Sequence, residues 1–199
     1  MKVIYIYGSS GHGLVLADIA QACGYEEIVY IDGTDSDHSG LDAISSDQKI
    51  PVALGVASNH TRKALFTKLV AQGFEIATLV HPTAVISPSA TLGQGTVVMP
   101  NVVVNAKAHI GDGVILNSGA IVEHESTIGD FTHISPNVSI ARKVIVEDLV
   151  HVGIGSCVIQ NIHIGRESAI GAGSVVISNI DPNTVAFGVP CKMQKPKSL

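Results

Sequence analysis

Residues 96–116 read TVVMPNVVVNAKAHIGDGVIL, and every sixth residue from Val98 onward in this stretch is aliphatic. The same register runs without a slip from Ile86 to Val176, and each of its positions holds Ile, Leu or Val. A second column, two residues earlier, holds small or β-branched residues. Neither an α-helix nor an isolated strand keeps a six-residue period, whereas a parallel β-helix of hexapeptide repeats does. We therefore expect three hexads per coil, with residues 18 apart stacked.

Glycines recur in one of these stacked columns, at Gly93, Gly111, Gly129 and Gly165, with Glu147 as the exception. Glycine reaches positive φ at little cost, so such a column is typical of a tight turn. We expect these four residues to occupy the positive-φ position of each coil.

The composition restricts the classes of function. A length of 199 residues allows one or two domains, and the net charge of -5 does not favour a nucleic-acid partner. The chain has no apolar run long enough for a membrane span and no signal peptide, so we expect no membrane insertion and a cytoplasmic location. Three scattered cysteines predict neither a disulfide framework nor a zinc site, and we expect no metal.

The N-terminal part reads as a small α/β unit. A strand over residues 3–7 precedes a glycine-rich loop, Gly8-Ser9-Ser10-Gly11-His12-Gly13, and a helix over residues 14–23. The next strand, residues 28–31, ends at Asp32, where related sheets bind a ribose or a base. The loop spacing is G-x-x-G-x-G, which is not the dinucleotide fingerprint. The loop alone therefore leaves open both nucleotide binding and a structural turn, and His12 is either a ligand contact or a solvated loop residue.

A third strand over residues 51–56 contains Gly55 near its end, and a helix capped by Asn59 runs to about residue 72. A fourth strand is expected over residues 76–80. The dipeptide His81-Pro82 then marks a domain boundary, because the residue before proline avoids helix and the repeat begins directly afterwards. We expect a βαβ, Rossmann-like domain over residues 1–81 and the β-helix with its tail over residues 82–199. We expect the ordered chain to end at residues 185–190.

The stacking rule gives each histidine a position on the coil. His133 and His151 share a column, whereas His124 lies half a circuit from His133. His124 is flanked by Glu123 and Glu125, whose carboxylates stabilise an imidazolium and raise its basicity. This setting suits a general base for an amine or hydroxyl nucleophile. If His124 and His133 act together, the site must lie between subunits, and a cyclic trimer would provide that arrangement.

Several segments together carry a family resemblance: residues 4–13, residues 121–125, His133, residues 170–176 and residues 188–190. In combination they resemble the bacterial PglD/NeuD-type sugar acetyltransferases of the hexapeptide-repeat superfamily. The residues of these motifs are most similar to those of the branch that acetylates UDP-linked 4-amino sugars. The resemblance implies a homotrimer of left-handed β-helices, acetyl-CoA bound between adjacent helices, and a nucleotide sugar held by the N-terminal domain.

The resemblance also implies roles for individual residues. His124 would be the general base, and Glu125 would raise its basicity. Acetyl-CoA would contact His133, Ile154 and Ala172. The acceptor nucleotide sugar would contact Gly11, His12, Gly13, Asp32, Gly33, Gly55 and Asn117.

The expected reaction is transfer of an acetyl group from acetyl-CoA to the 4-amino group of a UDP-linked 4-amino-4,6-dideoxy sugar, in bacterial glycan biosynthesis. A sugar O-acetyltransferase, acting for instance on a sialic acid, would use the same base and stays open. A metal-dependent lyase of the γ-carbonic-anhydrase type needs two histidines five residues apart, which this sequence lacks. A sugar-nucleotide binder without turnover is the remaining alternative, and the His124-Glu125 pair argues against it.

Overall fold

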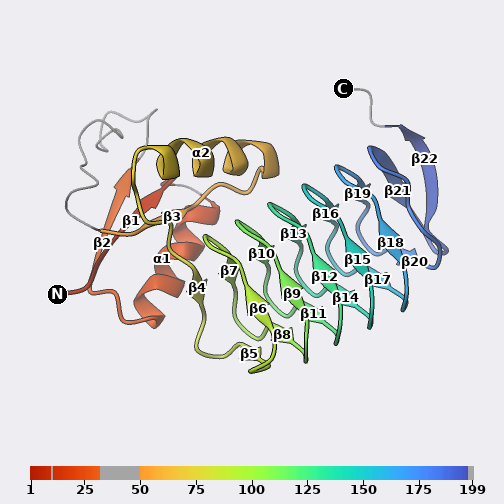
Figure 1. Cartoon of the computed structure of the whole chain (residues 1–199), viewed down its shortest axis with the longest axis horizontal. Helices are drawn as coiled ribbons and strands as arrows, with labels where there is room; N and C mark the ends of the chain where they lie inside the picture. The colour runs from red at the N-terminus through yellow and green to blue at the C-terminus, as the bar shows by residue number, and fades with distance from the viewer. Residues whose placement is uncertain (10, 32–49, 197–199) are drawn as a thin grey trace.

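The computed structural model describes residues 1–9, 11–31 and 50–196. It confirms the predicted fold class, a Rossmann-like α/β unit followed by a left-handed parallel β-helix. Figure 1 shows the α/β unit at one end of the β-helix and the C-terminal strands at the other end.

The α/β unit is a three-stranded parallel sheet between two helices. Its elements are β1 (Val3–Tyr7), α1 (His12–Ala22), β2 (Glu27–Ile31), β3 (Val52–Leu54) and α2 (Asn59–Ala71), and the strand order is β2-β1-β3. Side chains of β1 alternate between the two faces, as a pleated strand requires. Ile4 and Ile6 pack with Leu16 of α1, whereas Tyr5 packs with Leu65 of α2.

The predicted fourth strand over residues 76–80 is wrong. Ile76 forms only an isolated bridge to Val52, and β4 (Leu79–Val80) pairs instead with Val97 and Val98 of the β-helix. The first part of residues 76–80 therefore pairs with the sheet of the α/β unit, and the last part pairs with the β-helix. Because the buried residues of α1 and β1 belong to the same apolar cluster as the β-helix interior, the two parts of the chain share a continuous core.

Each hexad of the β-helix contributes one two-residue strand, and the strands stack into three faces. Face 1 consists of β4, β7 (Val97–Val98), β10 (Ile115–Leu116), β13 (His133–Ile134), β16 (His151–Val152) and β19 (Ala169–Ile170). Face 2 consists of β5 (Val85–Ile86), β8 (Val103–Val104), β11 (Ile121–Val122), β14 (Ser139–Ile140), β17 (Cys157–Val158) and β20 (Val175–Val176). Face 3 consists of β6 (Thr91–Leu92), β9 (His109–Ile110), β12 (Thr127–Ile128), β15 (Ile145–Val146) and β18 (His163–Ile164).

The pairing confirms that residues 18 apart stack. His133 pairs with His151, and Ile121 pairs with Ser139 on the next coil. The aliphatic column points inward, and residues such as Val122 and Ile134 are fully buried. Burial of this column, at about 25 cal/mol per Å² of apolar surface, is the main force that holds successive coils together.

The expectation for the glycine column is wrong. Positive φ occurs at every sixth residue from Gly95 to Gly173, two positions after that column, and most of the intervening residues are not glycine. Gly129 is required for a different reason, since a Cβ there would lie 2.6 Å from the backbone nitrogen of Asp148 on the next coil. The column marks close approach between coils, whereas the neighbouring left-handed corners accept residues such as Phe131.

The chain also continues further than expected in a regular structure. β21 (Thr184–Phe187) pairs in parallel with β19, and β22 (Lys192–Pro196) pairs antiparallel with β21. The predicted end of the ordered chain at residues 185–190 is therefore wrong, because the last two strands close the final coil of face 1. None of the helices in the described part of the chain is long and apolar enough to cross a membrane.

Candidate active site

The predicted site residues fall at two places on the β-helix. His124 and Glu125 lie between β11 and β12, at the corner that joins face 2 to face 3. His12, Asn117 and His133 lie where the α/β unit meets face 1, as the electrostatic influence of His12 on His133 indicates. In a triangular coil the corner between faces 2 and 3 is opposite face 1. One chain therefore does not bring the two groups together.

His124 and Glu125 form an exposed hydrogen-bonded pair. Nδ1 of His124 lies 3.1 Å from Oε2 of Glu125, and 43% of the His124 side chain is exposed. The hydrogen bond from His124 is the main cause that lowers the pKa of Glu125, and Lys143 lowers it further. Since a carboxylate only accepts, Nδ1 carries the proton in this pair and Nε2 is left as the basic nitrogen.

The second carboxylate beside His124 acts on the backbone. Oε2 of Glu123 accepts a hydrogen bond from the backbone nitrogen of His124 at 3.3 Å, not from the ring. The prediction of two flanking carboxylates is therefore half correct, because only Glu125 contacts the imidazole.

An apolar groove begins beside this corner. It has a volume of about 380 Å³ and runs along face 2, lined by Ile121, Glu123, Ser139, Ile140, Ala141, Cys157, Val158, Ile159 and Gln160. The groove is open to solvent, and its volume lies within the range of small-molecule sites. It ends one residue away from the candidate base, His124.

His133 is buried and held in a single tautomer. Oδ1 of Asn117 accepts from the backbone nitrogen of Ser118 at 2.8 Å, which turns the Asn117 amide nitrogen toward Nε2 of His133 at 3.2 Å. The amide nitrogen is a donor, so Nε2 of His133 accepts and Nδ1 carries the proton. Burial, followed by the charges of His151 and Arg62, lowers the pKa of His133 to about 3. His133 is therefore neutral, and its buried Nδ1 has no hydrogen-bond partner among the described residues.

His12 is in a similar environment. It is the first residue of α1, and its Nε2 is buried without a hydrogen-bond partner in the described part of the chain. Burial and the charge of Arg62 lower its pKa to about 4. Gly11, the N-cap of α1, has φ of 48°, and Gly13 packs directly on the carbonyl of Gly8.

The structure places Gly55 against the same loop, as expected from its position at a strand end. A Cβ on Gly55 would lie 2.8 Å from Cα of Gly13, so only glycine allows this approach. Asp32 and Gly33, which the sequence assigned to the acceptor, lie outside the described residues.

Ile154 and Ala172 stack on successive coils at the corner between faces 1 and 2. The backbone nitrogen of Gly173 donates to the carbonyl of Ile154 at 2.8 Å, and the Ile154 side chain is half exposed. Both residues follow strands of face 1, the face that carries His133. They lie on coils beyond it, toward the C-terminus.

Arg62 is the residue that the sequence analysis missed. It is 1% exposed, and burial lowers its pKa to about 10. One signal was available, because Arg62, Leu65 and Leu69 follow the i, i+3, i+7 spacing of a buried helix face and all three are buried. An arginine on the apolar face of a helix indicates a specific polar contact.

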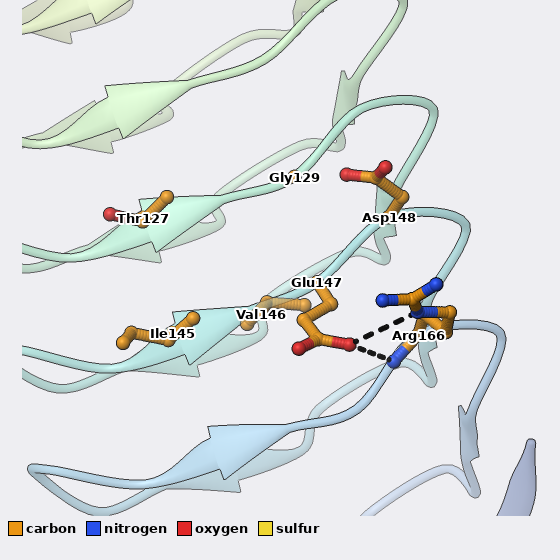
Figure 2. Close-up of a pocket in the computed structure, with 7 residues that line it drawn as sticks. All are labelled: Thr127, Gly129, Ile145, Val146, Glu147, Asp148 and Arg166. Carbon is orange, nitrogen blue, oxygen red and sulfur yellow. Dashed lines mark hydrogen bonds and ion pairs between the residues drawn. The ribbon is translucent and has the colours of Figure 1, made fainter. Parts of the chain in front are cut away.

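A further hollow lies on face 3, but its charged groups bind one another. Figure 2 shows Glu147 turned toward Arg166, with Thr127 and Ile145 on neighbouring strands. Glu147 Oε2 accepts from the backbone nitrogen of Arg166 at 2.8 Å, and Oε1 lies 2.9 Å from Nε2 of His163. These bonds satisfy the Glu147 carboxylate. Among the described residues no cluster of three or more His, Cys, Asp or Glu is arranged to hold a metal.

Comparison with known protein families identifies the N-terminal part. Residues 3–69 match the family model described as the PglD N-terminal domain. A curated relative from Bacillus subtilis (strain 168), UDP-N-acetylbacillosamine N-acetyltransferase, is 34% identical over 109 residues. That match spans 48% of this chain and half of the B. subtilis protein.

Solved structures match nearly the whole chain. The acetyltransferase domain of PglB from Neisseria gonorrhoeae FA1090 is 32% identical, with a TM-score of 0.92, and the match covers 98% of this chain and 100% of that domain. The same domain has been solved in complex with acetyl coenzyme A. PerB from Caulobacter crescentus, in complex with CoA and GDP-perosamine, is 32% identical with a TM-score of 0.93, and the match covers 96% of this chain and 97% of PerB.

Proposed function

Because this chain belongs to the PglD family of sugar N-acetyltransferases, we propose that it transfers the acetyl group of acetyl-CoA to the 4-amino group of a UDP-linked 4-amino-4,6-dideoxy sugar. The observation that carries this proposal is the His124–Glu125 pair. Its geometry leaves Nε2 of His124 as an accessible base beside an apolar groove.

The chemistry requires a base at this point. An ammonium ion has no lone pair, so the acceptor reacts as the free amine, and the nitrogen loses a second proton as it bonds to the thioester carbon. Nε2 of His124 accepts that proton, and Glu125 stabilises the resulting imidazolium. The C–S bond then breaks, and the CoA thiolate takes the proton from the imidazolium. The products are the N-acetylated sugar and free CoA, and no acyl-enzyme is needed.

We assign the other sequence-derived residues to the two substrates. Gly11, His12, Gly13, Asp32, Gly33, Gly55 and Asn117 serve the nucleotide sugar, and His133, Ile154 and Ala172 serve acetyl-CoA. The position of Gly55 against Gly13 supports a single acceptor site across two strand ends. For Asn117 the contacts favour an indirect role, since its amide is already bonded to Ser118 and His133.

A complete site in this proposal needs two chains. His124 of one subunit would meet His133 and the N-terminal loop of its neighbour in a homotrimer, because the two groups lie on opposite sides of each coil. Acetyl-CoA would lie between adjacent helices. We place the reaction in the cytoplasm, where acetyl-CoA is available. In this proposal residues 1–81 form the domain that binds the nucleotide sugar, and residues 82–199 form the β-helix that binds acetyl-CoA. The strand β4 connects the two.

The test is a panel of acceptors offered with acetyl-CoA, in which free CoA is measured and the product is weighed by mass spectrometry. The panel pairs UDP-linked and GDP-linked 4-amino sugars with hydroxyl acceptors, including sialic acids. Acetylation of a UDP-linked 4-amino sugar, with a gain of one acetyl group, supports the proposal. Acetylation confined to hydroxyl acceptors would replace it with O-acetyl transfer, and binding without turnover would replace it with a sugar-nucleotide binder.

A further inference from the structure

Arg62 is a buried cation whose hydrogen-bonding capacity is fully used. Its five N–H groups donate to neutral oxygens of Val56, Ala57, Asn59, Gly113 and Phe131, of which the shortest contact is 2.7 Å from Nε to Gly113. A guanidinium has five donors, so none is left for a ligand. The function of Arg62 must therefore lie in the two parts of the chain that it connects, the segment after β3 and the β-helix.

On one side Arg62 holds two successive coils of the β-helix. Gly113 and Phe131 are stacked left-handed corners, and Phe131 is two residues before His133. Asn59 extends the contact to a third coil, since its Nδ2 donates to the carbonyls of Leu149 and Val150 at 3.0 and 3.1 Å. The start of α2 is thus attached to three coils in register. Asn59 is not the helix cap that the sequence predicted, because Ser58 has that role.

On the other side Arg62 holds the chain that follows β3. Its Nη1 donates to the carbonyls of Val56 and Ala57 at 3.1 and 2.9 Å. The preceding residue, Gly55, donates its backbone N–H to Tyr7 at 2.8 Å and packs on Gly13, which follows His12. A continuous set of contacts therefore connects His133 to His12 through Arg62.

We propose that Arg62 is a positioning residue, which fixes the separation between the start of α1, where His12 lies, and the strand that carries His133. This inference rests on the proposed function, in which the first element holds the acceptor and the second the acetyl donor. Reaction rate depends steeply on this separation, since a misplacement of about 1 Å can cost on the order of a hundredfold. Lysine cannot replace Arg62, because one ammonium group cannot reach five acceptors arranged around a planar fork.

The test compares Arg62→Lys, Asn59→Ala and a control, Lys68→Gln, at an exposed position of the same helix. We expect Arg62→Lys to lower kcat about tenfold and Asn59→Ala about threefold, with the KM for each substrate within about twofold of wild type. Lys68→Gln should match wild type. A kcat of wild-type size in folded Arg62→Lys, or a loss carried by KM alone, would overturn the proposal. If Arg62→Lys does not fold, the same criteria apply to Asn59→Ala.

Amide hydrogen exchange separates this inference from the proposed function. Without substrates, amide exchange in Arg62→Lys should be faster than in wild type over residues 52–62 and 113–133, and equal to wild type over residues 157–176. If Arg62→Lys does not fold, the same result is expected for Asn59→Ala. If no acceptor in the panel is acetylated, the proposed function fails. The hydrogen-exchange result then tests by itself whether Arg62 connects the α/β unit to the β-helix. Unchanged exchange at the junction would then contradict this connection.

Discussion

Two histidine sites of this chain, the corner pair and the junction pair, have opposite surroundings. The corner pair is His124 with Glu125, which is half exposed and joined by a 3.1 Å contact between ring and carboxylate. The junction pair is His12, which is partly buried, with His133, which is buried; both lie near the cation of Arg62, and their pKa values are about 4 and 3. The imidazole ring is thus hydrogen-bonded to a carboxylate at one place and kept neutral by burial at the other.

In the reaction that we propose, this difference separates a base, His124, from a hydrogen-bond donor, His133. Nε2 of His124 can accept a proton because Nδ1 is bonded to a carboxylate. Nε2 of His133 is already occupied by Asn117, and its Nδ1 offers a fixed N–H. Burial and a neighbouring cation make a poor base, whereas they suit a group that donates to a carbonyl oxygen.

The largest effect is expected from removal of the corner base. His124→Ala should lower kcat by roughly 10² to 10⁴, the usual contribution of general base catalysis, with little change in KM for either substrate. Steady-state release of CoA measures it. His109→Ala is the matched control, since His109 is also exposed and lies on face 3. Near wild-type turnover in His124→Ala would remove the assignment of the base.

The junction pair should make folding stability depend on pH. Its folded pKa values lie below the unfolded value of 6.5, so the unfolded chain gains protons first as the pH falls, and stability present above pH 6.5 is lost below it. When the pH falls from 7.5 to 5.0, each of the two histidines should lower the free energy of unfolding by about 2 kcal/mol. Denaturant unfolding at the two pH values measures this loss.

The control for that measurement is His133→Gln, which keeps a neutral polar group at the same place. It should remove about half of the pH dependence attributed to the pair. An identical slope in the variant and in wild type would show that His133 is not held neutral by the fold.

A smaller effect is expected from the carboxylate of the corner pair. Glu125→Gln keeps the size of the side chain but removes the charge that stabilises the imidazolium, and should lower kcat on the order of tenfold. Glu123→Gln should lower it less, because Glu123 bonds to the backbone and not to the ring. The ratio of the two kcat values is the measurement, and equal losses would contradict the assigned difference between the carboxylates.

The positions of these histidines were predictable, but their surroundings were not. The six-residue register places His124 and His133 on opposite sides of a coil, because the pairing of residues 18 apart follows from the fold alone. Arg62 is 51 residues before its partner Gly113, and no local pattern connects them. The pKa of His133 is lowered mainly by burial and then by the charges of His151 and Arg62, so its neutral state appears only in the structure.

The corners of the coil and the boundary between the two parts of the chain were also only partly predictable. The register predicts that a turn occurs in each hexad, but it does not say which turn residue takes positive φ. That position holds Asn101 and Phe131 as well as Gly95. Residues 76–80 have the composition of a strand. Ile76 nevertheless pairs with Val52 of the α/β unit, whereas β4 pairs with β7 of the β-helix. The composition of the segment does not show where the chain passes from one sheet to the other.

We propose that the corner pair of one subunit completes the site of its neighbour in a homotrimer, and mixed trimers test this arrangement. His124→Ala and His133→Ala chains, each inactive or nearly so alone, are unfolded together and reassembled in equal amounts. If each site combines His124 of one chain with His133 of the next, random mixing restores about a quarter of the wild-type sites. Mixed trimers that form and regain no activity would contradict the account.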